Sequence, residues 1–143
     1  MNLQLEFSAN KNCEDVFLEI YCDNKKLIKS PAQYATQTIS LDLDEVQADH
    51  VLTLVMSGKN ASHTKIDDQE QIVDDVYFLI QKLEFEQLDM KEIFCLGYPC
   101  YTHSFNSTDP VFVDEFYGQL GCNGTVELCF STPIFLWLDQ YLT

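Results

Sequence analysis

Apolar and polar side chains alternate with a period of two residues through much of this chain, and no other feature of the sequence constrains the fold as strongly. The ranges 3–7 and 16–22 both show this alternation. Consecutive side chains of a strand point to opposite faces, so the period predicts strands with one buried face. The ranges 39–43 and 51–56 follow the same rule; we expect the first to be half exposed and the second to be central in its sheet.

The range 72–90 carries two competing patterns. Ile72, Val76, Ile80 and Leu83 lie at near-helical spacing, which favours a helix. The run 76–80, however, consists of β-branched and aromatic residues with one leucine, and charged residues further on alternate with apolar ones. We therefore predict extended structure for the whole range.

Turn-forming residues mark the connections between the predicted strands. Polar residues over 8–15 predict a hairpin loop, and 23–26 predict a second turn. Ser30-Pro31 is expected to interrupt a strand, because proline has no N–H for the ladder. A further short strand is predicted over 93–96.

The C-terminal quarter begins with another turn signal. Asn123-Gly124 is a turn pair and predicts the start of a strand over 125–131. Thr132-Pro133 then has the character of a helix N-cap followed by a first-turn proline, which predicts a short helix over 134–142. A final strand is the alternative for this last range.

Seven or more short strands with polar connections predict an all-β fold. We expect an antiparallel β-sandwich, jelly-roll-like, with a short C-terminal helix. At 143 residues the chain is long enough to form a full core, and no repeat, linker or low-complexity tract divides it. The sequence therefore predicts a single β-sandwich domain over residues 1–143.

The charge of the chain excludes one class of partner. Eight lysines, no arginine and 23 acidic residues give a formal net charge of −15. A surface that binds phosphates needs clustered basic residues, so no nucleic-acid partner is expected. No apolar run approaches the ~18 residues of a membrane span, and the N-terminus does not have the pattern of a signal peptide. We expect no membrane partner, and cytoplasmic synthesis without signal-peptide-directed secretion.

The cysteines do not predict a metal site. The six are Cys13, Cys22, Cys95, Cys100, Cys122 and Cys129. Without an export signal, and with a core of full size, half-buried free thiols are favoured over a disulfide framework. Cys95, Cys100 and His103 have C-x4-C-x2-H spacing, but no second ligand pair accompanies them at zinc-finger spacing.

One acidic group has the composition of a calcium loop. Its members are Asp67, Asp68, Glu70, Asp74 and Asp75. Calcium takes six to eight oxygen ligands, but the D-x-[DN]-x-[DN]-G pattern is missing here. A solvated turn is therefore favoured over a calcium site, and the sequence predicts no metal and no cofactor.

Known catalytic motifs do not occur in the sequence. It contains no G-x-S-x-G, no G-x-x-x-x-G-K-[ST] and no H-E-x-x-H, and Gly118, Gly121 and Gly124 are interpreted as turn glycines. The sequence therefore predicts a protein that is not an enzyme. A hydrolase whose Asp, Glu and His residues meet only in space is the alternative that remains open.

The range 97–123 is rich in aromatic residues and is long for a loop. Its candidate partner-binding residues are Tyr98, Tyr101, Phe105, Phe112, Phe116 and Tyr117. Rings in such a connection either pack into their own domain or are presented to a partner. The sequence leaves both alternatives open. Presented rings could stack on sugar faces or form the apolar centre of a protein interface.

Two stretches are similar to small β-sandwich proteins of contractile-tailed bacteriophages, some of which resemble carbohydrate-binding modules. The first runs from Met56-Ser57-Gly58-Lys59 through His63-Thr64-Lys65-Ile66-Asp67 to Ile72-Val73-Asp74-Asp75. The second runs from Phe116-Tyr117-Gly118 through Gly121-Cys122-Asn123-Gly124-Thr125 to Pro133-Ile134-Phe135-Leu136-Trp137-Leu138. The resemblance implies a turn glycine where this chain has Gln69-Glu70. It also implies a virion component made in the host cytoplasm.

These observations lead to two functional hypotheses. The first is a non-enzymatic interaction module, a structural or accessory component of a tailed-phage-like particle that binds other particle proteins in a homo- or hetero-oligomer. The second is a glycan-binding module, with calcium as a candidate assistant and with Tyr98, Tyr101 and Trp137 as stacking candidates. The apolar neighbours of Trp137 favour a place in the core for that ring.

Overall fold

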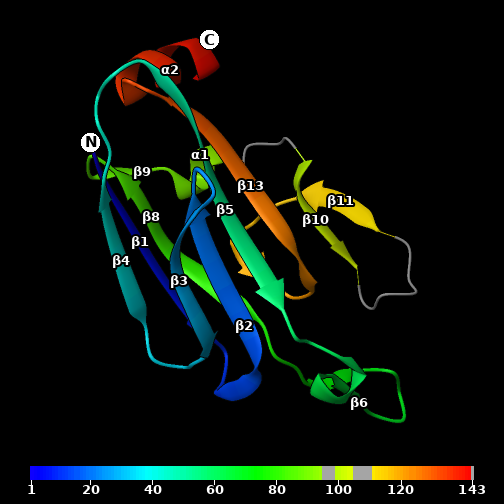
Figure 1. Cartoon of the computed structure of the whole chain (residues 1–143). Helices are drawn as coiled ribbons and strands as arrows, with labels where there is room; N and C mark the ends of the chain where they lie inside the picture. The colour runs from blue at the N-terminus through cyan, green and yellow to red at the C-terminus, as the bar shows by residue number, and fades with distance from the viewer. Residues whose placement is uncertain (95–98, 105–110, 143) are drawn as a thin grey trace.

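The computed structural model describes residues 1–94, 99–104 and 111–142, which form two facing β-sheets, a small hairpin and a C-terminal helix (Figure 1). The strands are β1 (Asn2–Ala9), β2 (Cys13–Cys22), β3 (Lys25–Ala32), β4 (Gln37–Asp42), β5 (Ala48–Ser57), β6 (Lys65–Ile66), β7 (Ile72–Asp74), β8 (Phe78–Phe85), β9 (Leu88–Asp89), β10 (Pro99–Ser104), β11 (Phe112–Glu115), β12 (Gln119–Leu120) and β13 (Asn123–Thr132). The helices are the 3-10 turn η1 (Ala61–His63), α1 (Lys91–Phe94) and α2 (Ile134–Leu142).

The strands pair antiparallel in two main sheets. The first sheet has the order β12-β8-β1-β4, with β9 also paired to β8, and the second has the order β11-β10-β13-β5-β2-β3. Strands β6 and β7 form a separate two-stranded hairpin. The predicted antiparallel β-sandwich with a short C-terminal helix is confirmed.

The core lies between the two sheets and follows the alternation in the sequence. In β1 the side chains of Leu3, Leu5 and Phe7 are buried, and the same alternation buries every second side chain of β5 from Leu52 to Met56. Strand β5 lies between β13 and β2, which confirms its central place, and β4 is a half-exposed edge strand, as predicted. The largest fully buried side chains include Phe7, Phe78, Phe85, Phe94 and Phe130.

The hairpin predicted between the first two strands is wrong. Strands β1 and β2 belong to different sheets, so their connection crosses from one layer to the other. The Asn10 side chain fixes this crossing, since it accepts a hydrogen bond from the backbone N–H of Tyr77 and donates one to the carbonyl of Asp75, each at 2.8 Å. Polar composition indicated a connection here, but it did not indicate which strands pair.

Strand β8 explains why the range 72–90 had two patterns. The pairing of β1 with β8 shifts register between Glu6 and Phe7, which lie opposite Lys82 and Ile80, so that Gln81 is an extra residue on β8. Such a bulge moves the following side chains to the other face. Ile80 and Leu83 are therefore both buried at a spacing of three residues within a strand. The predicted extended structure is confirmed for β7, β8 and β9 but not for the turn at Glu86-Gln87, where both residues have positive φ. The bulge accounts for the spacing of Ile80 and Leu83.

Two further predictions in the second sheet need correction. The turn predicted over 23–26 is only Asp23-Asn24, both with positive φ, and β3 already begins at Lys25. Strand β3 also continues through Pro31, where a break was expected. Because β3 is the edge strand of this sheet, a proline can be placed where its missing N–H faces no neighbouring strand.

The strand predicted over 93–96 is wrong in its described part. Ile93 and Phe94 belong to the short helix α1, which begins where the Asp89 side chain accepts a hydrogen bond from the N–H of Lys91 at 3.0 Å. Phe94 closes the turn by donating its N–H to the carbonyl of Met90. The Asp89 side chain thus satisfies the N–H of the first helical residue, which has no partner within the helix.

The Asn123-Gly124 pair is not a turn but the first two residues of β13. Gly124 has a close-packing role there, because a Cβ at this position would lie 2.2 Å from the backbone carbonyl oxygen of Thr102 in β10. The turn predicted before β13 is wrong for this reason. The strand itself and the helix α2 after it are confirmed.

Thr132 does not cap α2. Its hydroxyl donates to the carbonyl oxygen of Val46 at 2.6 Å and is buried at the end of β13.

Within the described ranges, no helix combines the length and the apolar character needed to cross a bilayer.

The range 97–123 is not a long loop, since it contains β10, β11 and β12.

The β6–β7 hairpin turns at Glu70, which has a φ of +60°. This left-handed conformation favours glycine, and it lies where the resemblance to phage β-sandwich proteins implies one. The Asp67 carboxylate supports the turn by accepting hydrogen bonds from the N–H groups of Gln69 and Gln71, each at 2.9 Å.

Candidate functional site

The two sheets differ in width, which leaves part of one inner face uncovered. The second sheet continues beyond β13 into β10 and β11, whereas the first sheet ends at the two-residue strand β12 (Figure 1). Tyr101 of β10 pairs with the core residue Val126 of β13, and paired residues share a face. The face of β10 that carries Tyr101 therefore continues the inner face of the sandwich. An open groove of about 590 Å³ lies over it.

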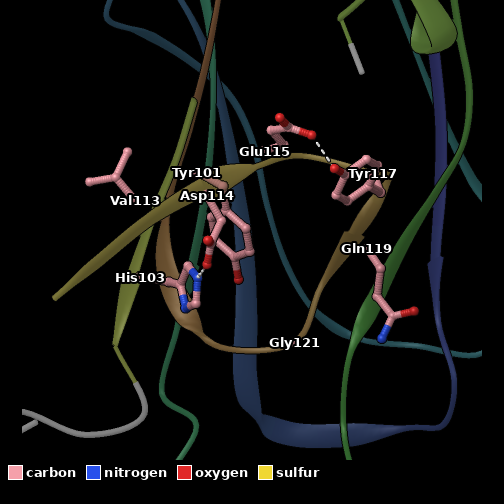
Figure 2. A pocket seen from close by; sticks show the side chains of 8 residues that line it. All are labelled: Tyr101, His103, Val113, Asp114, Glu115, Tyr117, Gln119 and Gly121. Atoms are coloured by element: carbon pink, nitrogen blue, oxygen red, sulfur yellow. Dashed lines mark hydrogen bonds and ion pairs between the residues drawn. The ribbon is translucent and has the colours of Figure 1, made fainter. Parts of the chain in front are cut away.

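Side chains of three strands line this groove (Figure 2). The lining residues are Tyr101 and His103 from β10, Val113, Asp114 and Glu115 from β11, and Tyr117, Gln119 and Gly121 from the segment through β12. In Figure 2 one polar pair, His103 with Asp114, lies apart from a second, Glu115 with Tyr117. The groove thus combines aromatic rings with carboxylates, an imidazole and an amide.

The two polar pairs hold their side chains in fixed positions. His103 Nε2 lies 2.6 Å from Asp114 Oδ2, and the Tyr117 hydroxyl donates to Glu115 Oε2. The imidazole of His103 is also packed between rings, with its centroid 4.5 Å from that of Tyr101 and 6.1 Å from that of Phe112. The Tyr117 ring, which is 69% exposed, is the most accessible aromatic surface of the groove.

Tyr101 joins the groove to the turn beside it. Its hydroxyl donates to the carbonyl of Cys122 at 2.7 Å and accepts from the N–H of the same residue at 3.1 Å. Burial of the ring raises the pKa of Tyr101 to about 12, so the hydroxyl stays protonated through the physiological range. Tyr101 therefore positions the Gly121–Cys122 backbone and exposes little surface of its own.

The six aromatic candidates divide into three groups. Tyr101 and Phe116 are buried, with ring centroids 6.2 Å apart in an edge-to-face arrangement, as the alternative of rings packed into the domain predicts. Phe112 and Tyr117 are exposed, as the other alternative predicts. Tyr98 and Phe105 lie outside the described residues.

The polar residues of the groove, His103, Asp114, Glu115 and Gln119, were not predicted from the sequence as binding residues. Strand β11 is exposed along its whole length, so its sequence has no apolar period that could have marked Asp114 and Glu115 as strand residues. The range was interpreted as a loop, and its polar residues were not considered as one face.

The acidic group and the cysteines form no metal centre in the described part of the chain, where no cluster of three or more His, Cys, Asp or Glu residues is arranged to hold an ion. Asp67 supports the hairpin turn, Asp74 pairs with Lys11 at 2.9 Å, and Asp75 pairs with Lys59 at 2.6 Å. Cys13, Cys22 and Cys122 carry free thiols, and burial raises the pKa of Cys22 to about 11. Cys95 lies outside the described residues.

A second polar constellation lies at the other end of the sandwich, near α2. His50 Nδ1 lies 2.6 Å from Asp23 Oδ2, and His50 Nε2 lies 3.1 Å from the hydroxyl oxygen of Thr132. This order of groups resembles a nucleophile, a base and an orienting acid. The Thr132 hydroxyl, however, is buried and donates its proton to the carbonyl of Val46, so it is not placed to attack a substrate.

Trp137 packs at the same end. Its ring stacks on Tyr141, with centroids 4.8 Å apart, and lies 6.0 Å from the core ring of Phe94. The half-buried indole therefore belongs to the contact between α2 and the core, as its apolar neighbours in the sequence predicted.

Comparisons with known proteins bear on the fold. No protein-family model matches the chain, and a search of curated proteins gave no significant match. Among solved structures, the chain is similar to one described as vCBM60 in complex with galactobiose, a carbohydrate-binding module, with a TM-score of 0.50 and 6% sequence identity over 89% of this chain and 96% of that one. At this identity the likeness shows a shared β-sandwich fold. The particle component and the oligomer stay predictions.

Proposed function

We propose that this protein is a non-catalytic glycan-binding module whose site is the groove over β10, β11 and β12. The observation that carries the proposal is the combination of an exposed ring, Tyr117, with the His103–Asp114 pair in one open groove. Sugars have an apolar ring face and a rim of hydroxyl groups, so they are bound by aromatic surfaces flanked by hydrogen-bonding side chains.

The polar groups of the groove suit a neutral ligand. Asp114 and Glu115 supply carboxylate acceptors, and the Gln119 amide supplies both a donor and an acceptor. Both carboxylates come from consecutive residues of one strand, β11, and each is already engaged, Asp114 by His103 and Glu115 by Tyr117. They do not oppose each other across the groove as an acid and a base in glycoside hydrolysis would. This arrangement supports binding over hydrolysis.

The likeness to a module solved with galactobiose supports the same proposal at the level of fold. It also suggests galactobiose as a first ligand. Xylo- and cello-disaccharides are added as other neutral disaccharides, and a glycan array extends this panel. Each measurement is made with calcium and with EDTA, so that a cation requirement is read directly.

The test is a titration of wild-type protein and two variants against this panel. We expect Tyr117→Ala to weaken binding of the recognised glycan by about tenfold or more, the loss of one buried aromatic contact of about 1.4 kcal/mol. Tyr34→Ala is the matched control, because Tyr34 is equally exposed but does not line the groove. Equal affinities of the two variants would reject the groove, and silence of the wild-type protein on the whole array would reject glycan binding.

A further inference from the structure

A second hollow lies next to the proposed glycan groove, between the β6–β7 hairpin and the Gly121–Cys122 turn. It measures about 300 Å³ and is more enclosed than the groove. Its lining residues are Lys59, Asn60, Ala61, Thr64, Ile66, Ile72, Asp75, Gly121 and Cys122. Gly121 lines both hollows, so the two adjoin at this residue, which we name the ridge.

The fold itself does not require glycine at position 121. Its φ lies outside the left-handed region, and a Cβ added there would meet no atom within 4 Å. Gly58 and Gly124, in contrast, are needed as glycines. Gly58 has a φ of +88°, and a Cβ there would lie 2.1 Å from a backbone oxygen. A Cβ at Gly124 would lie 2.2 Å from a backbone oxygen. The missing side chain of Gly121 therefore keeps open the space above the ridge and serves no packing need in the protein.

The ridge is held from both sides. From the first hollow, the Tyr101 hydroxyl makes two hydrogen bonds to the backbone of Cys122. From the second, the Lys59 ammonium donates to the carbonyl oxygen of Gly121 at 2.5 Å and pairs with the Asp75 carboxylate at 2.6 Å. A low ridge fixed in this way can lie under a ligand without collapsing into either hollow.

The chemistry of the second hollow matches that of a sugar unit. Ile66 and Ile72 lie opposite each other in the register of β6 and β7, so both project to one face of the hairpin, and both are more than 60% exposed. They offer an apolar wall. Thr64 and the Lys59–Asp75 pair add hydroxyl, ammonium and carboxylate groups to the lining.

We infer that the two hollows form one binding surface for a glycan chain longer than a disaccharide. The chain crosses the ridge at Gly121, and the unit beyond the ridge packs against Ile66 and Ile72. This inference rests on the proposed glycan binding and adds the length and direction of the ligand. It assigns the β6–β7 hairpin and Gly121 to recognition.

The test compares disaccharides with tetrasaccharides of the galacto-, xylo- and cello- series by isothermal titration. For the series that binds, the wild-type protein is expected to bind the tetrasaccharide about tenfold more tightly than the disaccharide. Gly121→Leu fills the space above the ridge, and Ile72→Ser removes part of the apolar wall. Both variants are expected to lose this gain. Ile72→Ser, which lies outside the first groove, is also expected to bind the disaccharide within about twofold of wild type.

Val73→Ser is the matched control for Ile72→Ser. Val73 is the next residue of β7, is equally exposed and does not line the hollow, so the gain with chain length should persist. Thermal unfolding checks that each variant is folded. Equal wild-type affinities for the two lengths, or a gain that survives both Gly121→Leu and Ile72→Ser, would overturn the extended site and leave glycan binding intact. Failure of every saccharide to bind would instead count against the proposed function.

Discussion

The body of the sandwich and its groove end are held together by different forces. In the body, the facing strands bury phenylalanine, leucine and isoleucine side chains, and Phe85 packs edge-to-face against both Phe94 and Phe130. At the groove end, position depends on a few polar contacts, above all Tyr101 with the Cys122 backbone and Lys59 with Asp75 and Gly121.

This difference separates stability from positioning. Apolar burial is non-directional and scales with area, so it supplies most of the folding free energy but specifies few exact positions. A hydrogen bond contributes only about 0.5–1.5 kcal/mol net, yet it fixes two groups within a few tenths of an ångström. A binding site on the edge of a stable sandwich therefore needs contacts of the second kind, and the predictions below measure the two kinds against each other.

The largest effect is expected in the body. Phe85 is fully buried, and Phe85→Ala removes a ring that contacts two other rings. We expect this variant to lose about 3–5 kcal/mol of unfolding free energy, measured by urea denaturation. Tyr117→Ala at the groove end should change the same quantity by no more than about 0.5 kcal/mol, because the ring is exposed.

A comparable loss in both variants would contradict the contrast between the two regions. It would mean that the exposed ring of the groove supports the fold as much as the core does. The pair of variants also separates folding from recognition, since only Tyr117→Ala is expected to weaken glycan binding while leaving the protein stable.

The difference between the body and the groove end also explains which strands could be predicted from the sequence. The alternation of side chains predicts strands wherever a strand is long and has one buried face, as in β1, β2, β5 and β13. The strands of the groove end are two to six residues long, and β11 is exposed on both faces. A strand with no buried face has no apolar period, so alternation could not identify β11. Strands β10 and β12 are too short to show a clear period, and the range 97–123 was therefore interpreted as a loop.

The sequence could predict that aromatic residues gather in this range, but not which of them are exposed. Aromatic density pointed to the range whose strands line the groove, but which rings are exposed depends on the widths of the two sheets, and width follows from strand pairing. Tyr101 and His103 are two residues apart on one face of β10 and both line the groove, yet Tyr101 is buried and His103 is only partly so. Nothing local to either residue encodes that difference.

The second largest effect is expected in the pH dependence of the unfolding free energy, through the titration of Tyr101. Its pKa is raised to about 12 in the folded protein by burial, against a value of 10.0 for an ordinary tyrosine. The folded state therefore holds this proton more strongly, and the stabilisation is complete below about pH 10 and lost as the pH rises through about 12. Two pKa units correspond to about 3 kcal/mol, so unfolding free energy should fall by roughly that amount across this window.

Tyr101→Phe supplies the reference for this measurement. It keeps the ring and all other groups that titrate in alkali, including Cys22, whose pKa is raised to about 11. We expect the difference between wild type and variant to shrink between about pH 10 and 12. A difference that stays constant with pH would mean that the Tyr101 hydroxyl is not protected by burial in the folded protein.

The smallest effect concerns the ion pair that holds the ridge. Lys59 and Asp75 are both largely buried. Burial alone would raise the pKa of Asp75, but the hydrogen bonds from Lys59 and Thr64 outweigh this effect. The pKa of Asp75 therefore lies below its usual value. Lys59→Met keeps the aliphatic stem and leaves Asp75 and the Gly121 carbonyl without the ammonium. We expect a loss of about 1–3 kcal/mol in unfolding free energy. Because the pKa of Asp75 is lowered, the contribution of its charge should be present at neutral pH and lost in acid.

Lys11→Met is the matched control for Lys59→Met. Lys11 pairs with Asp74, the residue next to Asp75, at 2.9 Å, but both side chains are about 40% exposed and the pair is screened by solvent. No measurable change in the urea midpoint is expected for it. If the two variants behaved alike, the ridge would not depend on Lys59, and Gly121 would have to be held by Tyr101 alone. If only Lys59→Met lost stability, the variant should also lose affinity for the longer saccharide, because the ridge beneath the ligand would no longer be fixed from the second hollow.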